Sequence, residues 1–317
     1  MSNVALITGI SGFAGSHLAE LLLLRDFKVY GFFHQKHPTE NITHLKNKIA
    51  LVTCDILDTK TVAREIKSVR PDYLFHLAAF ASPAQSFINP KETLVNNIVG
   101  ELNLLEAVAK IKSKAKILII GSADEYGDIE QKYLPATEDT PLAPTSPYAV
   151  SKVTQDMLGF EYYLRHKLNI VRVRPFNHIG PRQAPAFVVP AFASQIAALE
   201  KQGGGIVKVG NLESFRDFTD VRDTVKAYLL ALEKGRPGEV YNIGSGKSVK
   251  IADVLKTLLS FSKAEIKVEP DKSKMRPVDI KKIYCDFSKF HKQTGWQPTI
   301  SLEKTLFDTI EYERGKA

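Results

Sequence analysis

The alternation of short apolar strands with helical segments in the first half of the chain constrains its fold more than any other feature. Apolar, β-branched runs occupy residues 4–8, 28–33, 49–54, 73–77, 115–120 and 170–174. Segments with the period and composition of helices occupy residues 15–25, 59–68, 92–110 and 149–167. Strands that alternate with helices favour right-handed crossovers within one parallel sheet. The sequence therefore predicts an α/β fold built on a doubly wound parallel sheet.

The second half of the chain has a different texture. Prolines crowd a loop-rich stretch that follows Arg174. Helices are then expected at residues 192–201, 223–234 and 251–261 and from Leu302, with a turn at 203–205 and a strand at 265–269. The apolar run at residues 240–243 is expected to rejoin the main sheet. We expect a larger lobe formed by residues 1–176 and 218–245, and a smaller α/β lobe formed by residues 177–217 and 246–317.

Composition and charge point to a globular protein with a small anionic partner. The chain has 317 residues, of which 44% are hydrophobic and 25% charged, and its net charge is +8. The densest basic cluster, at residues 110–116, has no interleaved aromatic residues, so we expect no nucleic-acid partner. A phosphorylated small molecule fits this moderate excess of positive charge.

Membrane, disulfide and metal sites are not expected. The longest apolar run, Leu21–Leu24, is too short to span a membrane. The two cysteines, Cys54 and Cys285, cannot build a disulfide framework, and the eight histidines form no ligand cluster. With no basic leader segment at its start, the sequence predicts a cytoplasmic protein.

A glycine-rich turn follows the first predicted strand and opens the first predicted helix. Glycines at positions 9, 12 and 15 permit a tight turn, close approach of the backbone to a diphosphate, and close packing of helix on strand. The helix N-terminus then presents free N–H groups to the anion. The residues expected to contact a dinucleotide here are Gly9, Ser11, Gly12, Phe13, Ala14 and Gly15. This places a Rossmann-type cofactor domain in the larger lobe, and the Gly-x-x-Gly-x-x-Gly spacing resembles that of extended short-chain dehydrogenases/reductases.

The end of the second strand indicates which cofactor binds. An acidic residue there would bind the ribose 2′-hydroxyl of NAD and would repel the 2′-phosphate of NADP. The sequence has His34 and Lys36 instead, so we expect NADP, with NAD as the alternative. By the resemblance, Asp55 and Ile56 would lie at the adenine edge, although Asp55 could instead cap a turn or helix.

The resemblance also implies a catalytic Tyr with a Lys four residues later on one helix. That spacing occurs three times, at Tyr148/Lys152, Tyr163/Lys167 and Tyr312/Lys316. We favour Tyr148 and Lys152, because they follow a polar Ser-Pro helix entry and because Ser122 ends a buried strand at the ligand-binding edge of the sheet. An ammonium at this spacing is expected to lower the pKa of the Tyr phenol.

Two further segments fit the same resemblance. Leu77, Ala78 and Ala79 end the fourth strand beside the expected path of the nicotinamide. Asn97 matches the site asparagine of the superfamily, with a buried amide that closes a backbone gap as the alternative.

Four stretches of the second half narrow the resemblance. They are Arg-Pro-Phe-Asn-His-Ile-Gly-Pro at 174–181, the segment at 209–223 with Arg-Asp-Phe-Thr-Asp-Val-Arg-Asp, Gly-Glu-Val-Tyr-Asn-Ile-Gly-Ser-Gly at 238–246, and Met-Arg-Pro-Val-Asp at 275–279. Together they resemble the nucleotide-sugar branch, and most closely the GDP-6-deoxy-D-mannose reductases. The resemblance implies that the smaller lobe holds a GDP-sugar. The implied contacts are Ser86, Ser122, Asn177, Val188, Arg216, Arg276 and Asp279, although each arginine could instead form a surface ion pair.

By this resemblance, NADPH would reduce the 4-keto group of GDP-4-keto-6-deoxy-D-mannose to give GDP-D-rhamnose. Tyr148 would donate a proton, Lys152 would tune Tyr148 and hold the nicotinamide ribose, and Ser122 would bind the carbonyl oxygen. Asp124 takes the position of a dehydratase glutamate, so a GDP-mannose 4,6-dehydratase remains an alternative, with Glu125 as a further carboxylate. A 4-epimerase, a bifunctional enzyme and a non-catalytic dinucleotide-binding module are the others.

The superfamily also forms homodimers. By the same resemblance, the helices at residues 92–110 and 149–167 would form the interface, although their apolar faces could equally be covered within one chain.

Overall fold

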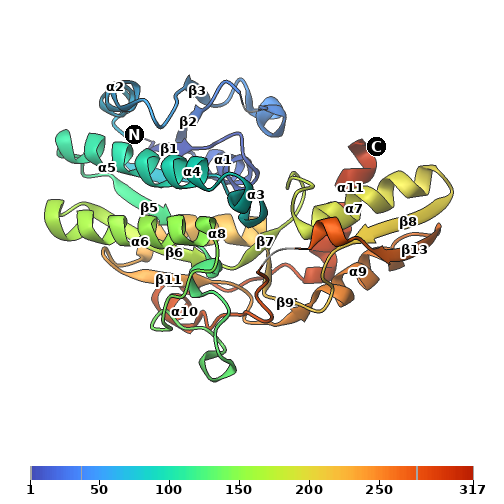
Figure 1. Ribbon diagram of the computed structural model, residues 1–317. Helices are drawn as coiled ribbons and strands as arrows, with labels where there is room; N and C mark the ends of the chain where they lie inside the picture. The colour runs from blue at the N-terminus through green and yellow to red at the C-terminus, as the bar shows by residue number, and fades with distance from the viewer. Residues whose placement is uncertain (1, 37, 276–277, 317) are drawn as a thin grey trace.

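The computed structural model describes residues 2–36, 38–275 and 278–316, and within them a seven-stranded parallel sheet forms the centre of the larger lobe (Figure 1). The strand order is β11-β6-β5-β4-β1-β2-β3. The bounds are β1 Val4–Thr8, β2 Lys28–Phe33, β3 Ala50–Thr53, β4 Tyr73–His76, β5 Lys116–Ile120, β6 Asn169–Pro175 and β11 Val240–Ile243. All pairs in this sheet are parallel, and β11 joins it beside β6. The predicted α/β fold with a doubly wound sheet is confirmed.

Helices cover both faces of this sheet. α1 (Phe13–Leu24) and α8 (Val221–Lys234) lie on one face, and α2 (Thr59–Val69), α5 (Gly100–Lys110) and α6 (Pro147–His166) lie on the other. Side chains alternate between the two faces: Ile7 belongs to the core under α1 and α8, and its neighbour Leu6 to the core under α5 and α6. Strands buried on both faces require the near-continuous apolar runs that the sequence has. None of the described helices combines the length and the apolar character needed to cross a membrane.

The segment expected as one helix over residues 92–110 is built from three pieces. It begins with α4 (Pro90–Leu94), continues through a single π-helical turn (Val95–Val99) and ends with α5. The preceding short helix α3 (Pro83–Ile88) was not predicted. A π-turn inserts an extra residue into a helix and often marks a functional site. Here it carries Asn97 toward α6.

The smaller lobe has its own hydrophobic core. α7 (Val188–Lys201), α9 (Ile251–Ser260) and α11 (Leu302–Lys316) pack around a two-stranded parallel sheet of β8 (Gly204–Val209) and β13 (Glu265–Pro270). The sequence predicted a turn at residues 203–205, whereas the structure begins β8 at Gly204. Three consecutive glycines are typical of a turn, but here the backbone of Gly204 pairs with Glu265 of β13.

Short strands connect the two lobes. β7 (Asn177–Ile179) pairs with β10 (Phe218–Asp220), and β9 (Phe215–Arg216) pairs with β12 (Val249–Lys250). The remaining short elements are the 3-10 turns Glu40–Leu45, Ala123–Tyr126, Gln131–Tyr133 and Lys272–Lys274, and helix α10 (Ser288–Thr294).

One part of the expected lobe boundary needs adjustment. Phe290 and Trp296 belong to the core of the larger lobe, although residues 246–317 were expected in the smaller lobe. Their burial depends on contact with Tyr241, which local sequence does not specify. We therefore propose the two-lobe division with the segment around α10 assigned to the larger lobe.

Candidate active site

The glycine turn between β1 and α1 is packed too closely for side chains. Gly9 has a φ of +70°, and a Cβ atom there would lie 2.9 Å from the Cα of Ala78. A Cβ atom on Gly15 would lie 2.4 Å from the carbonyl oxygen of Gly9. Gly12 precedes α1, and no side chain caps this helix, so its first amide groups remain available for an anion. The turn therefore has the shape that a bound diphosphate requires.

Hydrogen bonds fix the neighbouring strand end. The Thr8 hydroxyl accepts from the amide of Ala78 at 3.1 Å and lies 2.9 Å from Nδ1 of His76. Burial, together with the charge of Lys152, lowers the pKa of His76 to about 3, so this ring is neutral at physiological pH. The carboxyl ends of β1 and β4 are thus held together at the floor of the site.

A cleft of about 1660 Å³ lies between the two lobes and brings most of the predicted cofactor and substrate residues together. Its walls include Gly9, Ser11, Gly12, Phe13, Ala14, Gly15, His34, Lys36, Asp55, Ile56, Leu77, Ala78 and Ala79 from the cofactor set. They also include Asn177, Val188, Arg216 and Asp279 from the substrate set. Two ligands bound to these walls would therefore meet in one continuous cleft.

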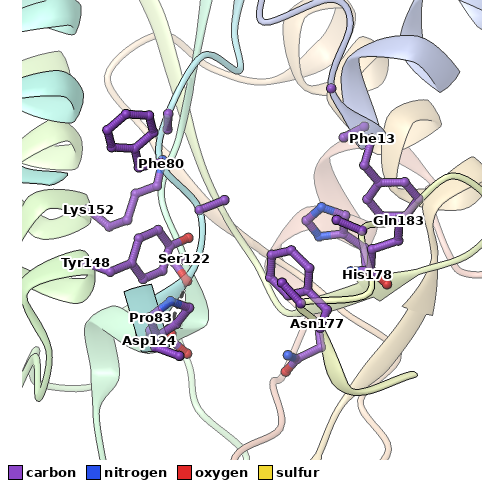
Figure 2. Close-up of a pocket in the computed structure, with 18 of the residues that line it drawn as sticks. Phe13, Phe80, Pro83, Ser122, Asp124, Tyr148, Lys152, Asn177, His178 and Gln183 are labelled. Atoms are coloured by element: carbon purple, nitrogen blue, oxygen red, sulfur yellow. Dashed lines mark hydrogen bonds between the residues drawn. The ribbon is translucent and has the colours of Figure 1, made fainter. Parts of the chain in front are cut away.

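Ser122, Tyr148 and Lys152 converge on one wall of this cleft (Figure 2). Ser122 lies two residues after the end of β5, at the carboxyl end of the sheet. α6 begins at Pro147, and the side chain of Ser146 accepts from the amide of Ala149 at 3.1 Å. This capped start holds Tyr148 in the first turn, opposite Ser122.

Burial dominates the electrostatics of the Tyr/Lys pair. It raises the pKa of Tyr148, as does the charge of Asp124, whereas a hydrogen bond with the Ser122 hydroxyl lowers it. Burial also lowers the pKa of Lys152 to about 8, and its Nζ donates to the carbonyl oxygen of Ile120 at 2.8 Å. The predicted lowering of the Tyr148 pKa is therefore wrong for this structure, because desolvation of the phenol outweighs the effect expected of the ammonium. Tyr148 is protonated at neutral pH, which suits a proton donor.

The two carboxylates after Ser122 have different surroundings. Asp124 lines the cleft, and its amide donates to the Ser122 hydroxyl at 3.1 Å. Glu125 is fully buried, accepts from the amide of Ser122 at 2.7 Å and lies 3.1 Å from Nε of Arg174. Burial raises the pKa of Glu125 to about 8. Of the two, Asp124 is the carboxylate that a substrate could reach.

Asn97 and Ser86 do not line the cleft. The Asn97 amide is buried, accepts from the amide of Phe80 at 2.8 Å and donates to its carbonyl oxygen at 3.1 Å. Asn97 therefore fits its alternative interpretation, a buried amide that closes a backbone gap. The expectation that Ser86 contacts substrate does not hold here, because its buried hydroxyl donates to the carbonyl oxygen of Pro83 at 2.7 Å. Both residues instead support the loop that carries Phe80 and Pro83 into the cleft (Figure 2).

A polar cluster lies at the end of the cleft formed by the smaller lobe. Arg216 pairs with Asp279 at 2.7 Å and donates to the carbonyl oxygen of Ile280 at 2.6 Å. Asp279 also accepts from Asn211 at 2.8 Å and from Ser214 at 2.7 Å. Arg216 therefore forms an ion pair, which is the alternative to substrate binding, and it also lies on the cleft wall. Arg276 lies outside the described residues.

Among the cleft residues that were not predicted as site residues, three lie on the wall opposite Tyr148 or tie it to α1. His178 stacks on Phe13 with ring centroids 5.7 Å apart, and Gln183 donates to the carbonyl oxygen of His178 at 3.1 Å. Arg182, with a φ of +75°, pairs with Glu20 of α1 at 2.8 Å. Figure 2 shows Phe13, His178 and Gln183 across the cleft from Tyr148. The sequence signal for these three residues was the proline-rich loop and the motif beside it. Their contacts with α1 could not be predicted, because they join residues more than 150 positions apart.

The other two Tyr-x-x-x-Lys pairs do not reach the cleft. The ring of Tyr163 packs beside Gly238 near the far end of α6. Lys316 lies 4.1 Å from the ring centroid of Tyr312 on α11. The choice of Tyr148 and Lys152 by context is thus consistent with their placement.

Comparison with known proteins places this arrangement in a family. The sequence model of the family described as GDP-mannose 4,6 dehydratase matches residues 6–309. The chain belongs to the GDP-mannose 4,6-dehydratase family. Within the extended short-chain dehydrogenases/reductases, this family also has relatives that catalyse other reactions on nucleotide sugars.

Individual relatives of this family member cover the whole chain. GDP-6-deoxy-D-mannose reductase of Pseudomonas aeruginosa is 32% identical over 96% of this chain and 95% of its own. The structure of RMD from Pseudomonas aeruginosa complexed with NADPH matches with a TM-score of 0.85 and 29% identity over 100% of both chains. UDP-glucose 4-epimerase of Thermotoga maritima with UDP-glucose matches with a TM-score of 0.89 and 31% identity over 99% of both. The resemblance inferred from the sequence motifs is confirmed.

Proposed function

We propose that this protein reduces the 4-keto group of GDP-4-keto-6-deoxy-D-mannose with NADPH and releases GDP-D-rhamnose. The observation that carries this proposal is the meeting of Ser122, a protonated Tyr148 and Lys152 in the cleft shared by the glycine turn and the smaller lobe. Similarity to the Pseudomonas reductase over nearly the full length supports the substrate. The chemistry of the three side chains supports a carbonyl reduction.

The chain's own groups would act on the carbonyl oxygen. NADPH, when bound, supplies the hydride. The Ser122 hydroxyl donates a hydrogen bond to the oxygen, which orients the carbonyl and stabilises developing negative charge. Tyr148 then gives its phenolic proton to the alkoxide, and the nearby Lys152 ammonium stabilises the phenolate that remains.

NADPH is the proposed reductant because of the residues at the end of β2. Lys36 and His34 lie on the cleft wall at this position. An acidic residue in their place would repel the 2′-phosphate of NADPH. Asp55, a carboxylate that also lines the cleft, lies 3.7 Å from Nε2 of His34. The glycine turn, into which a Cβ would not fit, supports the position of the diphosphate.

We propose that the GDP moiety binds on the smaller-lobe side of the cleft. Asn177, Val188, Arg216 and Asp279 supply the contacts there that the family resemblance implies. Arg216 retains a planar, permanently charged fork that suits a phosphate.

A dehydratase is the second candidate, because Asp124 lines the cleft and because the family includes GDP-mannose dehydratases. The deciding experiment follows NADPH absorbance with GDP-4-keto-6-deoxy-mannose, in parallel with GDP-mannose and catalytic NADP⁺. Consumption of NADPH in the first reaction supports the reductase. Turnover in the second reaction alone supports the dehydratase, and conversion of a nucleotide sugar to its C4 epimer supports an epimerase. NADPH binding without any turnover would indicate a non-catalytic module.

We also propose that the protein is a homodimer. α6 exposes Val150, Met157 and Leu164, which recur at helical spacing along one side. Val95 and Val99 are exposed on the neighbouring π-turn, which packs against α6. A second copy that covers this stripe would remove these side chains from water.

A reducing, cytoplasmic setting is the proposed location. Cys54 and Cys285 are both buried free thiols. Burial raises the pKa of each thiol, which keeps it unreactive. Cell fractionation with an antibody to the protein tests this location.

A further inference from the structure

A buried polar ladder runs behind the catalytic wall, between the π-turn with α5 and helix α6. Asn97 donates to the Ser151 hydroxyl at 2.9 Å in the first rung. One turn further along, Glu101 occupies the same face of its helix, and Gln155 of α6 is among the groups that influence its ionisation. Neither Asn97 nor Glu101 lines the cleft, so this ladder supports the catalytic wall from behind.

Glu101 is the unusual member of this ladder. Its side chain is completely buried, and neither carboxylate oxygen has a partner within hydrogen-bond geometry among the described residues. A buried carboxyl without such partners destabilises the fold, and it does so more strongly as an anion than as a neutral acid. Its neighbours Leu104 and Leu105 on α5 are apolar and belong to a hydrophobic core, so the carboxyl differs from the side chains around it. This cost points to a role in the chemistry of the site.

The groups that surround Glu101 come from three elements. On β4, Nε2 of His76 lies 3.9 Å from Oε2 of Glu101. On α6, Lys152 and Gln155 favour the charged carboxylate, whereas Asp156 opposes it.

Two more charged groups complete the cluster. Glu125, after β5, also opposes ionisation of Glu101. Arg174 of β6 lies within ion-pair distance of both Glu125 and Asp156 and so compensates these two acids. Lys152 is therefore the cation left to pair electrostatically with Glu101.

The influence of Glu101 and Lys152 on each other is reciprocal. Burial raises the pKa of Glu101 well above its usual range, and the charge of Lys152 is the first factor that opposes this rise. Burial lowers the pKa of Lys152 to about 8, and Glu101 is the first factor that opposes this fall. When the carboxyl loses its proton, it leaves a negative charge beside the ammonium, and this charge makes Lys152 keep its own proton to higher pH.

We propose that Glu101 is a positioning residue that keeps the buried Lys152 ammonium charged while Tyr148 donates its proton. The inference rests on the proposed reductase function. In that reaction the hydride adds to C4, the carbonyl π electrons pass to the oxygen, and the O–H bond of Tyr148 breaks as its proton moves to that oxygen. The phenolate left behind needs the ammonium, and solvent restores its proton afterwards. A neutral Lys152 would leave the phenolate buried without a counter-charge.

The test is the Glu101→Gln variant, which keeps the shape of the side chain and removes its charge. We expect the alkaline limb of the pH profile of kcat/KM to move to lower pH by about one unit or more, because the loss of a nearby negative charge lowers the pKa of Lys152. At pH 6, where Lys152 stays protonated in both proteins, rates should agree within about threefold. Glu101→Asp should lie between the two, and Glu106→Gln, on the exposed side of the same helix, should leave the limb in place. An unmoved limb in folded Glu101→Gln overturns the proposal.

A second measurement does not depend on turnover. The NMR signal of the Lys152 side chain, titrated without substrate, should give a lower pKa in Glu101→Gln than in the wild type. In the wild type, the titrations of the Glu101 carboxyl and the Lys152 ammonium should be coupled. This measurement uses the wild-type protein alone and so does not depend on whether a variant folds. Independent titrations would overturn the inference. If the wild type failed to reduce the keto sugar but retained coupled titrations, the proposed function alone would be rejected.

Discussion

At the scale of single residues, Tyr148 carries the proton that the proposed reaction consumes. Tyr148→Phe removes this proton and leaves the ring in place, so turnover of the keto sugar should fall by about 100- to 10,000-fold. Affinity for NADPH should stay within about threefold, because the phenyl ring still packs in the same wall. Steady-state rates and NADPH fluorescence titration measure the two effects.

Tyr163→Phe is the matched control for this prediction. It changes the same residue type in the same spacing pattern on the same helix, but outside the cleft. Its turnover should equal that of the wild type. If Tyr148→Phe retained wild-type turnover, Tyr148 would have no place in the mechanism.

Lys36 should control the choice between the two nicotinamide cofactors. Lys36→Ala removes a cation from the proposed 2′-phosphate site, so the ratio of kcat/KM for NADPH to that for NADH should fall about tenfold. The same change at Lys48, which is exposed outside the cleft, should leave the ratio unchanged. Equal ratios in the wild type and Lys36→Ala would place the 2′-phosphate contact elsewhere.

At the scale of elements, α1 is tied to the loop after β7 through His17. Its Nε2 lies 2.9 Å from the carbonyl oxygen of Pro181. Burial, followed by the charge of Arg182, lowers the pKa of His17 from 6.5 to about 4. Between these two pH values the unfolded chain binds a proton that the folded chain does not bind. Stability should therefore fall as the pH drops from 6.5 toward 4.

His17→Gln tests this coupling between pH and stability. The Gln amide can still donate to Pro181 but does not titrate, so the variant should lose less stability than the wild type between pH 6.5 and 4.5. The difference in the free energy of unfolding should be about 2 kcal/mol or less, measured by denaturant titration at each pH. His166→Gln, on the exposed end of α6, should retain the wild-type slope. A slope unchanged in His17→Gln would contradict the assignment.

Elements whose signals are local could be predicted from the sequence, and elements that depend on distant contacts could not. The glycine turn and the Ser-Pro entry to α6 are local, so both the tight turn after β1 and the position of Tyr148 in the first turn of α6 could be predicted. The π-turn that carries Asn97 was expected as ordinary helix, because the residues that Asn97 contacts, Phe80 and Ser151, lie outside the segment. Glu101 was missed for the same reason, since its significance arises only where α5 meets α6.

At the scale of the whole molecule, the exposed stripe on α6 is the proposed interface between two copies. The wild type should elute as a dimer in size-exclusion chromatography with light scattering. Met157→Lys combined with Leu164→Lys should shift it to a monomer, because two charges would enter an apolar interface. The same change at Val268, an exposed apolar residue of the smaller lobe, should leave the dimer intact. A monomeric wild type, or a double variant that stays dimeric, would refute this interface.

The lobe arrangement could be predicted only in part. The return of β11 to the main sheet followed from its apolar run, and the smaller lobe followed from the change of pattern after Arg174. The position of Phe290 in the larger core could not be foreseen, because it packs on Tyr241 from a segment that follows most of the smaller lobe. Similarly, the ion pair between Arg182 and Glu20 could not be foreseen, because the two residues lie far apart in the sequence.

The stack of Phe13 on His178 has a consequence for how binding in one half of the cleft affects binding in the other half. Phe13 begins α1 directly after the glycine turn, and His178 lies in β7 at the entrance to the smaller lobe. A molecule bound against the start of α1 would contact Phe13, and through the stacked ring of His178 it would affect β7, which leads to the opposite wall. Occupancy of one half of the cleft should change the affinity of the other half, and by linkage the effect must be equal in both directions.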